Sequence, residues 1–133
     1  MINMPKYFEP TEALNSYVDA FNRGDLQAAL KLYESKASLF VETGKIVHGK
    51  KAIKNVLEKL MAQKPVIEIE TAKFTEDSDI VACCTRWELR NSADVKLQHQ
   101  TFISTEILRR QADGSWLISV HSPWGGQFLD EAL

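Results

Sequence analysis

The fold of this chain is decided by one stretch, TEILRRQADGSWLISVHSPWG, which runs from Thr105 to Gly125. Apolar residues lie before the pair Asp113-Gly114, at Ile107 and Leu108, and after it, at residues 116–118. An Asp-Gly pair between two strand-like segments is typical of a tight β-hairpin, because the central turn positions favour residues that tolerate a positive φ. The stretch therefore predicts two antiparallel strands joined at Asp113-Gly114.

The segments before this hairpin extend the same sheet. Residues 66–74 alternate between apolar and polar side chains, and Asp77-Ser78-Asp79 turns the chain between the first two segments. We expect strands over residues 66–74, 80–90, 95–110 and 117–122. Residues 91–94 form the exit from the second strand, and the third is long enough to contain a bulge or bend.

The first half of the chain predicts helices. Thr11 is the expected N-cap of the first, whose apolar residues recur at helical spacing, and Gly24 is able to take the left-handed conformation that ends it. Asp25 caps a second helix, expected to run through Leu26, Ala29, Leu30 and Tyr33. Short strands over residues 37–41 and 46–47 precede a third helix, which starts near Lys50 and carries one apolar stripe: Ile53, Val56, Leu57 and Leu60.

Three helices followed by a long meander predict an α+β fold, with the helices packed on one face of the sheet. A strongly bent, mostly antiparallel sheet wrapped over helices encloses a cone, whose mouth is lined by strand residues and by the first helix. We divide the chain into an N-terminal extension over residues 1–10, one domain over residues 11–126 and a C-terminal tail over residues 127–133.

Composition excludes several classes of function. The 133 residues carry a net charge of −2 with no basic block, which argues against nucleic-acid binding. No apolar run is long enough to span a bilayer, and the N-terminal residues lack the apolar core of a secretory signal. Cys83 and Cys84 are adjacent, so on a strand they point to opposite faces and do not form a disulfide. We expect a cytoplasmic protein with no metal and no cofactor.

Several motifs, taken in order, resemble a known superfamily. They are YVDAFNRGDL at residues 17–26, ASLF at residues 37–40, VHGKKAI at residues 47–53 and the RR…DGSWLI hairpin. Together they are similar to the nuclear-transport-factor-2-like superfamily, in its SnoaL-like, ketosteroid-isomerase-like branch. The resemblance covers about residues 11 to 125 and implies a conical α+β fold, often dimeric through the sheet. The superfamily contains isomerases, polyketide cyclases, dehydratases and non-enzymatic association domains, so function has to be argued from the site.

The resemblance places the oxyanion-binding tyrosine of ketosteroid isomerases on Tyr17, which is retained. It places the carboxylate base on Val41 and a supporting tyrosine on Leu57. Val41 cannot take up a proton, and Leu57 has no hydroxyl group. The protonated acid of those enzymes falls near Glu106. The resemblance therefore argues against steroid isomerisation by that route.

His121 is the candidate that SnoaL-type cyclases suggest, because they use an acidic residue or a histidine to move a proton. It lies on the last expected strand, at a place where related chains often have an aspartate, and an imidazole titrates near neutral pH. The alternative is a histidine that only forms hydrogen bonds within the sheet or at a dimer contact. We hold both open and take His121, Tyr17 and Glu106 as the catalytic candidates.

Strand alternation assigns faces. Leu117, Ser119 and His121 are expected to share one face of the last strand, and Gln98, Gln100, Phe102, Ser104 and Glu106 one face of its neighbour. We favour the phase in which His121, Gln100 and Glu106 face the cone. In the other phase His99, Thr101 and Ile103 would line it.

The aromatic residues are either core or ligand contacts. We take as candidate ligand-binding residues Phe21, Tyr33, Phe40, Trp87, Gln100, Phe102 and Trp124. Trp124, after Pro123, is expected to flank the entrance or a dimer seam.

Three functions remain open at this stage. The first is proton-transfer chemistry on a small apolar carbonyl compound, as an isomerase, cyclase or dehydratase. The second is a cone that binds a small apolar molecule without turning it over, or that serves only a homodimer formed through the sheet. The third is an association domain that binds another protein chain through the sheet.

Overall fold

The computed structural model describes residues 6–41, 44–90 and 100–125. Within these residues, six strands form one sheet in the order β2-β1-β6-β5-β4-β3. The elements in chain order are α1 (Pro10–Arg23), α2 (Leu26–Leu30), β1 (Tyr33–Phe40), β2 (Ile46–His48), α3 (Lys50–Ala62), β3 (Val66–Asp77), β4 (Ile80–Arg90), β5 (Gln100–Arg110) and β6 (Trp116–Ser122). All neighbouring strands are antiparallel except β1 and β6, which run parallel.

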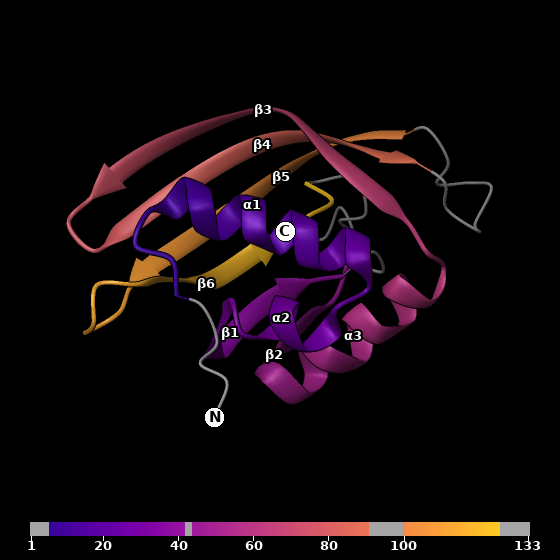
Figure 1. Ribbon diagram of the computed structural model, residues 1–133, viewed down its shortest axis with the longest axis horizontal. Coiled ribbons are helices and arrows are strands. Elements are labelled where there is room, and N and C mark those ends of the chain that lie inside the picture. The colour runs from indigo at the N-terminus through magenta and orange to yellow at the C-terminus, as the bar shows by residue number, and fades with distance from the viewer. Residues whose placement is uncertain (1–5, 42–43, 91–99, 126–133) are drawn as a thin grey trace.

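The long strands β3, β4 and β5 arch over α1, so the sheet is strongly curved around the helix (Figure 1). α1 contacts β3 and β6, while α3 packs on β1 and β2, and α2 lies against both other helices. This arrangement confirms the predicted α+β fold with three helices on one face of a curved sheet.

The helix boundaries follow local chemistry with one correction. Thr11 is not the N-cap of α1, because Glu9 holds that position without a side-chain hydrogen bond and Pro10 fills the first turn. Proline suits this place because its fixed φ is already helical and its missing N–H would have no partner there. Gly24 ends α1 with a φ of 70°, and the Asp25 side chain accepts a hydrogen bond from the Ala28 N–H, so both of these predictions are confirmed.

Tyr33 was predicted at the end of the second helix, and this is wrong. α2 ends at Leu30, and Tyr33 is the first residue of β1, paired with Ile118 on β6. The backbone N–H of Ile118 donates to the carbonyl of Leu32 at 2.7 Å, so pairing with the C-terminal strand overrides the short helical pattern. β1 is accordingly longer than the predicted strand over residues 37–41.

The later strands agree with the sequence pattern. β4 has the predicted bounds, and β5 and β6 form the predicted hairpin with Gly114 at a φ of +87°. Cys83 is buried and Cys84 exposed, as expected for neighbours on opposite faces. The predicted exit over residues 91–94, the first five residues of the strand predicted over residues 95–110 and the tail over residues 127–133 lie outside the described residues.

β6 breaks the strict alternation that the sequence suggested. Ile107 pairs with Val120 while Leu108 pairs with Ile118, so Ser119 is an extra residue in β6. Such a bulge shifts the facing of the residues that follow it. Trp116, Ile118 and His121 are therefore buried together, and the prediction that Leu117 and Ser119 share the face of His121 is wrong.

The inner face of β5 is buried from Phe102 to Leu108. Leu108 is fully buried in the main core, so replacing it with alanine removes contacts that the surroundings cannot refill. We expect Leu108→Ala to lower the free energy of unfolding by about 2–5 kcal/mol, measured by urea denaturation. Ile46→Ala, at an exposed residue on the edge strand β2, serves as the control and should cost less than about 1 kcal/mol. Equal losses in the two variants would contradict this assignment of the core.

Candidate functional site

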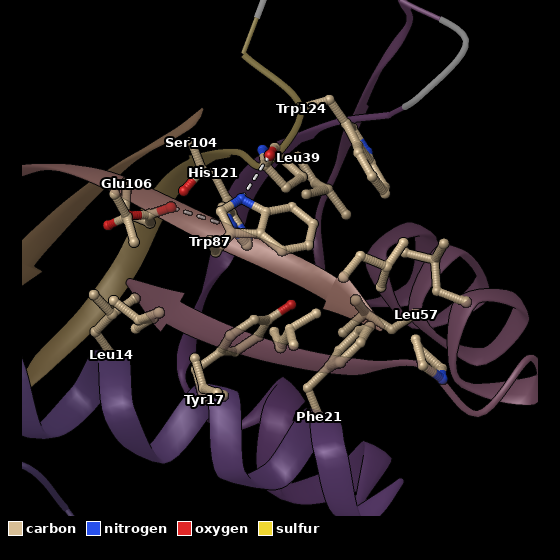
Figure 2. A pocket seen from close by; sticks show the side chains of 18 of the residues that line it. Leu14, Tyr17, Phe21, Leu39, Leu57, Trp87, Ser104, Glu106, His121 and Trp124 are labelled. Carbon is tan, nitrogen blue, oxygen red and sulfur yellow. Dashed lines mark hydrogen bonds and ion pairs between the residues drawn. The ribbon is translucent and has the colours of Figure 1, made fainter. Parts of the chain in front are cut away.

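A pocket opens between α1, α3 and the inner face of the sheet, with a cavity volume of about 70 Å³ (Figure 2). Its walls are mostly apolar. They include Leu14 and Phe21 from α1, Leu57 and Leu60 from α3, and Trp87 from β4. These side chains project inward because each lies on the apolar stripe of its helix or at an inward position of its strand.

Most polar groups of the pocket come from neighbouring strands and from α1, and Gln63 adds one at the end of α3. Thr85 on β4 is directly opposite Ser104 on β5, and Glu106 on β5 is directly opposite His121 on β6. Directly opposed residues of antiparallel strands point to the same face, so these four side chains meet inside the curved sheet. Tyr17 reaches them from α1 (Figure 2).

The hydroxyl of Tyr33 links two of these groups from behind. It donates to the Tyr17 hydroxyl oxygen at 2.9 Å and lies 2.8 Å from Nδ1 of His121. Because a phenol has one proton, the Tyr33 oxygen accepts from an Nδ1–H of His121 when Tyr33 donates to Tyr17. His121 then presents an unprotonated Nε2, 3.6 Å from Oε2 of Glu106.

The proton of Tyr17 itself is left for a partner in the pocket. Tyr17 accepts from Tyr33, and no described residue accepts from Tyr17 in return. Burial raises the pKa of Tyr17 and the pKa of Tyr33, so both phenols keep their protons at neutral pH.

Glu106 is a buried carboxyl group held by hydroxyl donors. The Thr85 hydroxyl donates to its Oε1 at 2.9 Å, and Cys83 lies 3.1 Å from the same hydroxyl. Burial raises the pKa of Glu106, while hydrogen bonds from Ser104, Thr85 and Cys83 act in the opposite direction. A carboxyl group whose pKa moves towards neutrality is suited to take up and release a proton.

Burial lowers the pKa of His121 to about 4. The imidazole is therefore neutral at neutral pH, with one protonated and one unprotonated nitrogen. The ring is able to take up a proton on one nitrogen while it releases a proton from the other. It carries no charge in the resting site.

The pocket includes most of the residues selected from the sequence. Those that line it are Tyr17, Phe21, Phe40, Trp87, Glu106, His121 and Trp124. Gln98 and His99 lie outside the described residues. Thr101 and Ile103 point to the exposed outer face, so the inward phase of β5 is the one that contains Ser104 and Glu106.

Three of the predicted ligand contacts do not line the pocket. Tyr33 is fully buried behind Tyr17 and His121. Phe102 stacks on Trp87 with ring centroids 5.0 Å apart and so supports the wall from outside. Gln100 is the first residue of β5, half-buried and away from the cavity.

Sequence reasoning missed Thr85. The signal was available, because Val81, Cys83, Thr85, Trp87 and Leu89 alternate along β4 and all face inward. Ser104 was placed on the correct face but was not named as a site residue. Val41, where the resemblance places a carboxylate base, does not line the pocket.

An aromatic cluster closes one side of the pocket. It consists of Trp87, Phe102 and Trp124, with Trp87 and Trp124 centroids 5.6 Å apart. The indole N–H of Trp87 donates to the carbonyl of Pro123 at 3.0 Å, which fastens the segment after β6. Gly125 follows with a φ of +59°, and a Cβ there would lie 2.6 Å from the carbonyl oxygen of Ile103. Only glycine fits that close approach of two backbones.

In the described part of the chain, His, Cys, Asp and Glu side chains do not gather in groups of three or more that could hold a metal ion. The helices of the same residues are all too short or too polar to cross a membrane.

The comparisons with known proteins agree with this architecture. The sequence model of the SnoaL-like domain family matches residues 14–118. No curated protein sequence matches the chain significantly.

Among solved structures, one similar protein is from Shewanella frigidimarina NCIMB 400 and is provisionally named a ketosteroid isomerase. It has 18% identity, a TM-score of 0.74 and coverage of 84% of this chain and 90% of that one. An NTF2-like protein of unknown function from Pseudomonas putida KT2440 has 17% identity, a TM-score of 0.75 and coverage of 86% and 82%. A protein from Thiobacillus denitrificans ATCC 25259, provisionally named a calcium/calmodulin-dependent protein kinase type II association domain, has 17% identity, a TM-score of 0.75 and coverage of 90% and 98%. At these identities the likeness establishes the fold alone.

The buried imidazole makes stability depend on pH. The pKa of His121 falls from an ordinary 6.5 to about 4 on folding, so between these values the unfolded chain binds a proton that the folded chain does not. The contribution of His121 to the free energy of unfolding is therefore unchanged above about pH 7. It decreases as the pH falls, by roughly 2 kcal/mol at about pH 5. We expect His121→Gln to lose this dependence, measured by urea unfolding at both pH values.

The comparison between variant and wild type isolates this effect. The raised pKa of Glu106 has the opposite effect on stability, because it stabilises the folded state as the pH falls. The pH dependence of wild-type unfolding therefore contains the effects of both residues. His48→Gln, at an exposed histidine of β2, is the control and should keep the wild-type dependence. An unchanged pH dependence in His121→Gln would refute the assignment.

Proposed function

The chain belongs to the SnoaL-like domain family, and from that premise we propose that it binds a small apolar carbonyl compound and moves a proton on it. The activity is of the isomerase, cyclase or dehydratase type. The observation that carries this proposal is the meeting of one buried carboxyl group, Glu106, and one free phenol proton, on Tyr17, inside a mostly apolar cavity. Apolar walls with a few convergent polar groups are typical of small-ligand sites.

Each polar group has a role that its surroundings support. Tyr17 donates its free proton to the carbonyl oxygen and stabilises the negative charge that develops there. Glu106 takes the proton from the carbon next to the carbonyl group, because its pKa is raised towards neutrality while Thr85 and Ser104 hold it in place. His121, a catalytic candidate from the sequence, is less suited to be the base, because it is a neutral imidazole whose pKa is lowered to about 4.

The size of the cavity limits the ligand. Its volume of about 70 Å³ is roughly half that of an engineered cavity of about 150 Å³ that binds benzene. The ligand is therefore a compound of a few carbon atoms, or the reactive end of a longer molecule whose remainder extends out of the cavity. Val41 and Leu57, which stand where the resemblance places a base and a tyrosine, also argue against a steroid handled by the ketosteroid isomerase route.

Exchange of carbon-bound protons tests this proposal without knowledge of the product. We expect the protein to accelerate deuterium uptake at the α-carbon of small ketones, with acetylacetone as the first probe, measured by proton NMR in heavy water. Glu106→Gln keeps the shape of the side chain and removes the base, so the rate should fall at least about 100-fold. Glu58→Gln, on the exposed face of α3, is the matched control. A wild-type rate in Glu106→Gln, or no acceleration by the wild type, would refute the proposal.

The alternative is a domain that binds a ligand or a partner chain without catalysis. It is supported by the absence of a carboxylate at Val41 and by the likeness in fold to a protein provisionally named as an association domain. Stabilisation of the chain by apolar carbonyl compounds in a thermal-shift screen, together with no proton exchange, would favour this alternative.

We also propose a homodimer formed through the outer face of the sheet. Ile80 on β4 and Ile103 on β5 are large apolar residues exposed on that face, at 39% and 54%. A charge introduced there would be buried against the second copy, so Ile103→Lys should convert a dimer to a monomer in sedimentation analysis. Ile46→Lys, on the edge strand β2, is the control. A protein that is monomeric to begin with would contradict the proposed dimer.

A further inference from the structure

We propose that Tyr33 and His121 form an internal proton relay that carries a proton from Glu106 to Tyr17, so that the reaction at this site is a keto–enol tautomerisation. This inference rests on the proposed function and deepens it. It assigns a role to Tyr33, which does not line the cavity and therefore does not touch a ligand.

The geometry provides a continuous path through four side chains from four elements. Tyr17 on α1 lies 2.9 Å from Tyr33 on β1, and Tyr33 lies 2.8 Å from Nδ1 of His121 on β6. The path continues from Nε2 of His121 to Oε2 of Glu106 on β5 at 3.6 Å, roughly 0.6 Å beyond an ordinary hydrogen bond. Transfer over that last step requires one of the two side chains to rotate.

The direction of the hydrogen bonds matches the direction of transfer. Tyr33 donates to Tyr17, the Nδ1–H of His121 donates to Tyr33, and the unprotonated Nε2 faces Glu106. Each proton therefore lies on the side from which it has to move towards Tyr17. A path with one bond reversed would need a side-chain rotation before any transfer.

The chemistry is balanced over one pass. Glu106 takes a proton from the α-carbon of the ketone, the C–H electron pair forms the carbon–carbon double bond, and the carbonyl oxygen takes the proton of Tyr17. Glu106 then gives its proton to Nε2 of His121, the Nδ1 proton moves to Tyr33, and the Tyr33 proton moves to Tyr17. The ketone has become its enol, and all four side chains have their original charges.

The relay solves a difficulty that burial creates for Tyr17. Burial raises the pKa of this phenol, so Tyr17 by itself is a weak acid. No lysine or arginine lines the described part of the pocket to stabilise a phenolate there. Tyr33 gives a proton to Tyr17 as Tyr17 gives its own proton to the ligand, so no phenolate has to persist.

After one pass the path has the opposite polarity, with the proton of His121 on Nε2. The reverse reaction requires this arrangement. The tautomer with the proton on Nδ1 therefore acts on the ketone, and the tautomer with the proton on Nε2 acts on the enol. The other groups that face Glu106 are Cys83, Thr85 and Ser104 on β4 and β5, which are neutral donors to its carboxyl group. They hold Glu106 without competing for the path through His121.

Tyr33→Phe interrupts the path and leaves the lining of the pocket intact. For the interconversion of acetylacetone and its enol, followed by ultraviolet absorbance, we expect kcat to fall about 10-fold or more and KM to stay unchanged. The lost rate should return as the concentration of a small buffer such as imidazole rises, because the buffer replaces the proton of Tyr17. The wild-type rate should not depend on buffer. Tyr7→Phe, which removes a tyrosine hydroxyl outside the site, is the matched control.

Three results for Tyr33→Phe would overturn the relay: a kcat equal to that of the wild type, a decrease in kcat that buffer does not restore, or a decrease in kcat accompanied by a change in KM. Nitrogen-15 NMR of the His121 ring gives a second test that needs no turnover. We expect the resting imidazole to carry its proton on Nδ1, and a proton on Nε2 would contradict the assigned direction. A wild type that does not turn over acetylacetone, with the proton on Nδ1, would refute the proposed function while leaving the hydrogen-bonded path intact.

Discussion

The hydroxyl of Tyr33 is the contact on which the rest of the site depends. It joins a phenol on α1 to an imidazole on β6, and both bonds are buried. Leaving a buried hydroxyl without a partner costs about 1–3 kcal/mol, so the three side chains stabilise one another only in this arrangement. They fix the depth at which α1 lies in the curved sheet, and with it the shape of the pocket.

Burial of Glu106 is the complementary constraint. An ionised carboxylate in an apolar interior is costly unless it is hydrogen-bonded, and here Cys83 and Thr85 on β4 and Ser104 on β5 supply those bonds. These hydrogen bonds act against burial, which raises the pKa of the Glu106 carboxyl group. The same desolvation makes the neighbouring imidazole neutral, so the site contains a proton acceptor and a neutral carrier in contact.

The SnoaL-like fold explains why such a site can differ from that of its relatives. The curved sheet and α1 place inward positions from several strands around one hollow, and the chemistry depends on which side chains occupy them. In this chain Val41 has no carboxyl group, and the carboxyl group and the imidazole of the pocket are on β5 and β6. The aromatic cluster of Trp87, Phe102 and Trp124 keeps one wall apolar and fastens the segment that follows β6.

The amino-acid sequence predicted the order of elements, the hairpin at Asp113-Gly114, the end of α1 at Gly24 and which residues of β5 share a face. These features depend on local periodicity and on turn residues, which act over a few positions. The folded structure was needed to show which face of β5 points inward, that Tyr33 begins a strand, that Ser119 is an extra residue in β6 and that Thr85 faces Glu106. Each of these depends on pairing with a strand distant in the chain, and a one-residue shift of register reverses the facing of a side chain without changing the local pattern.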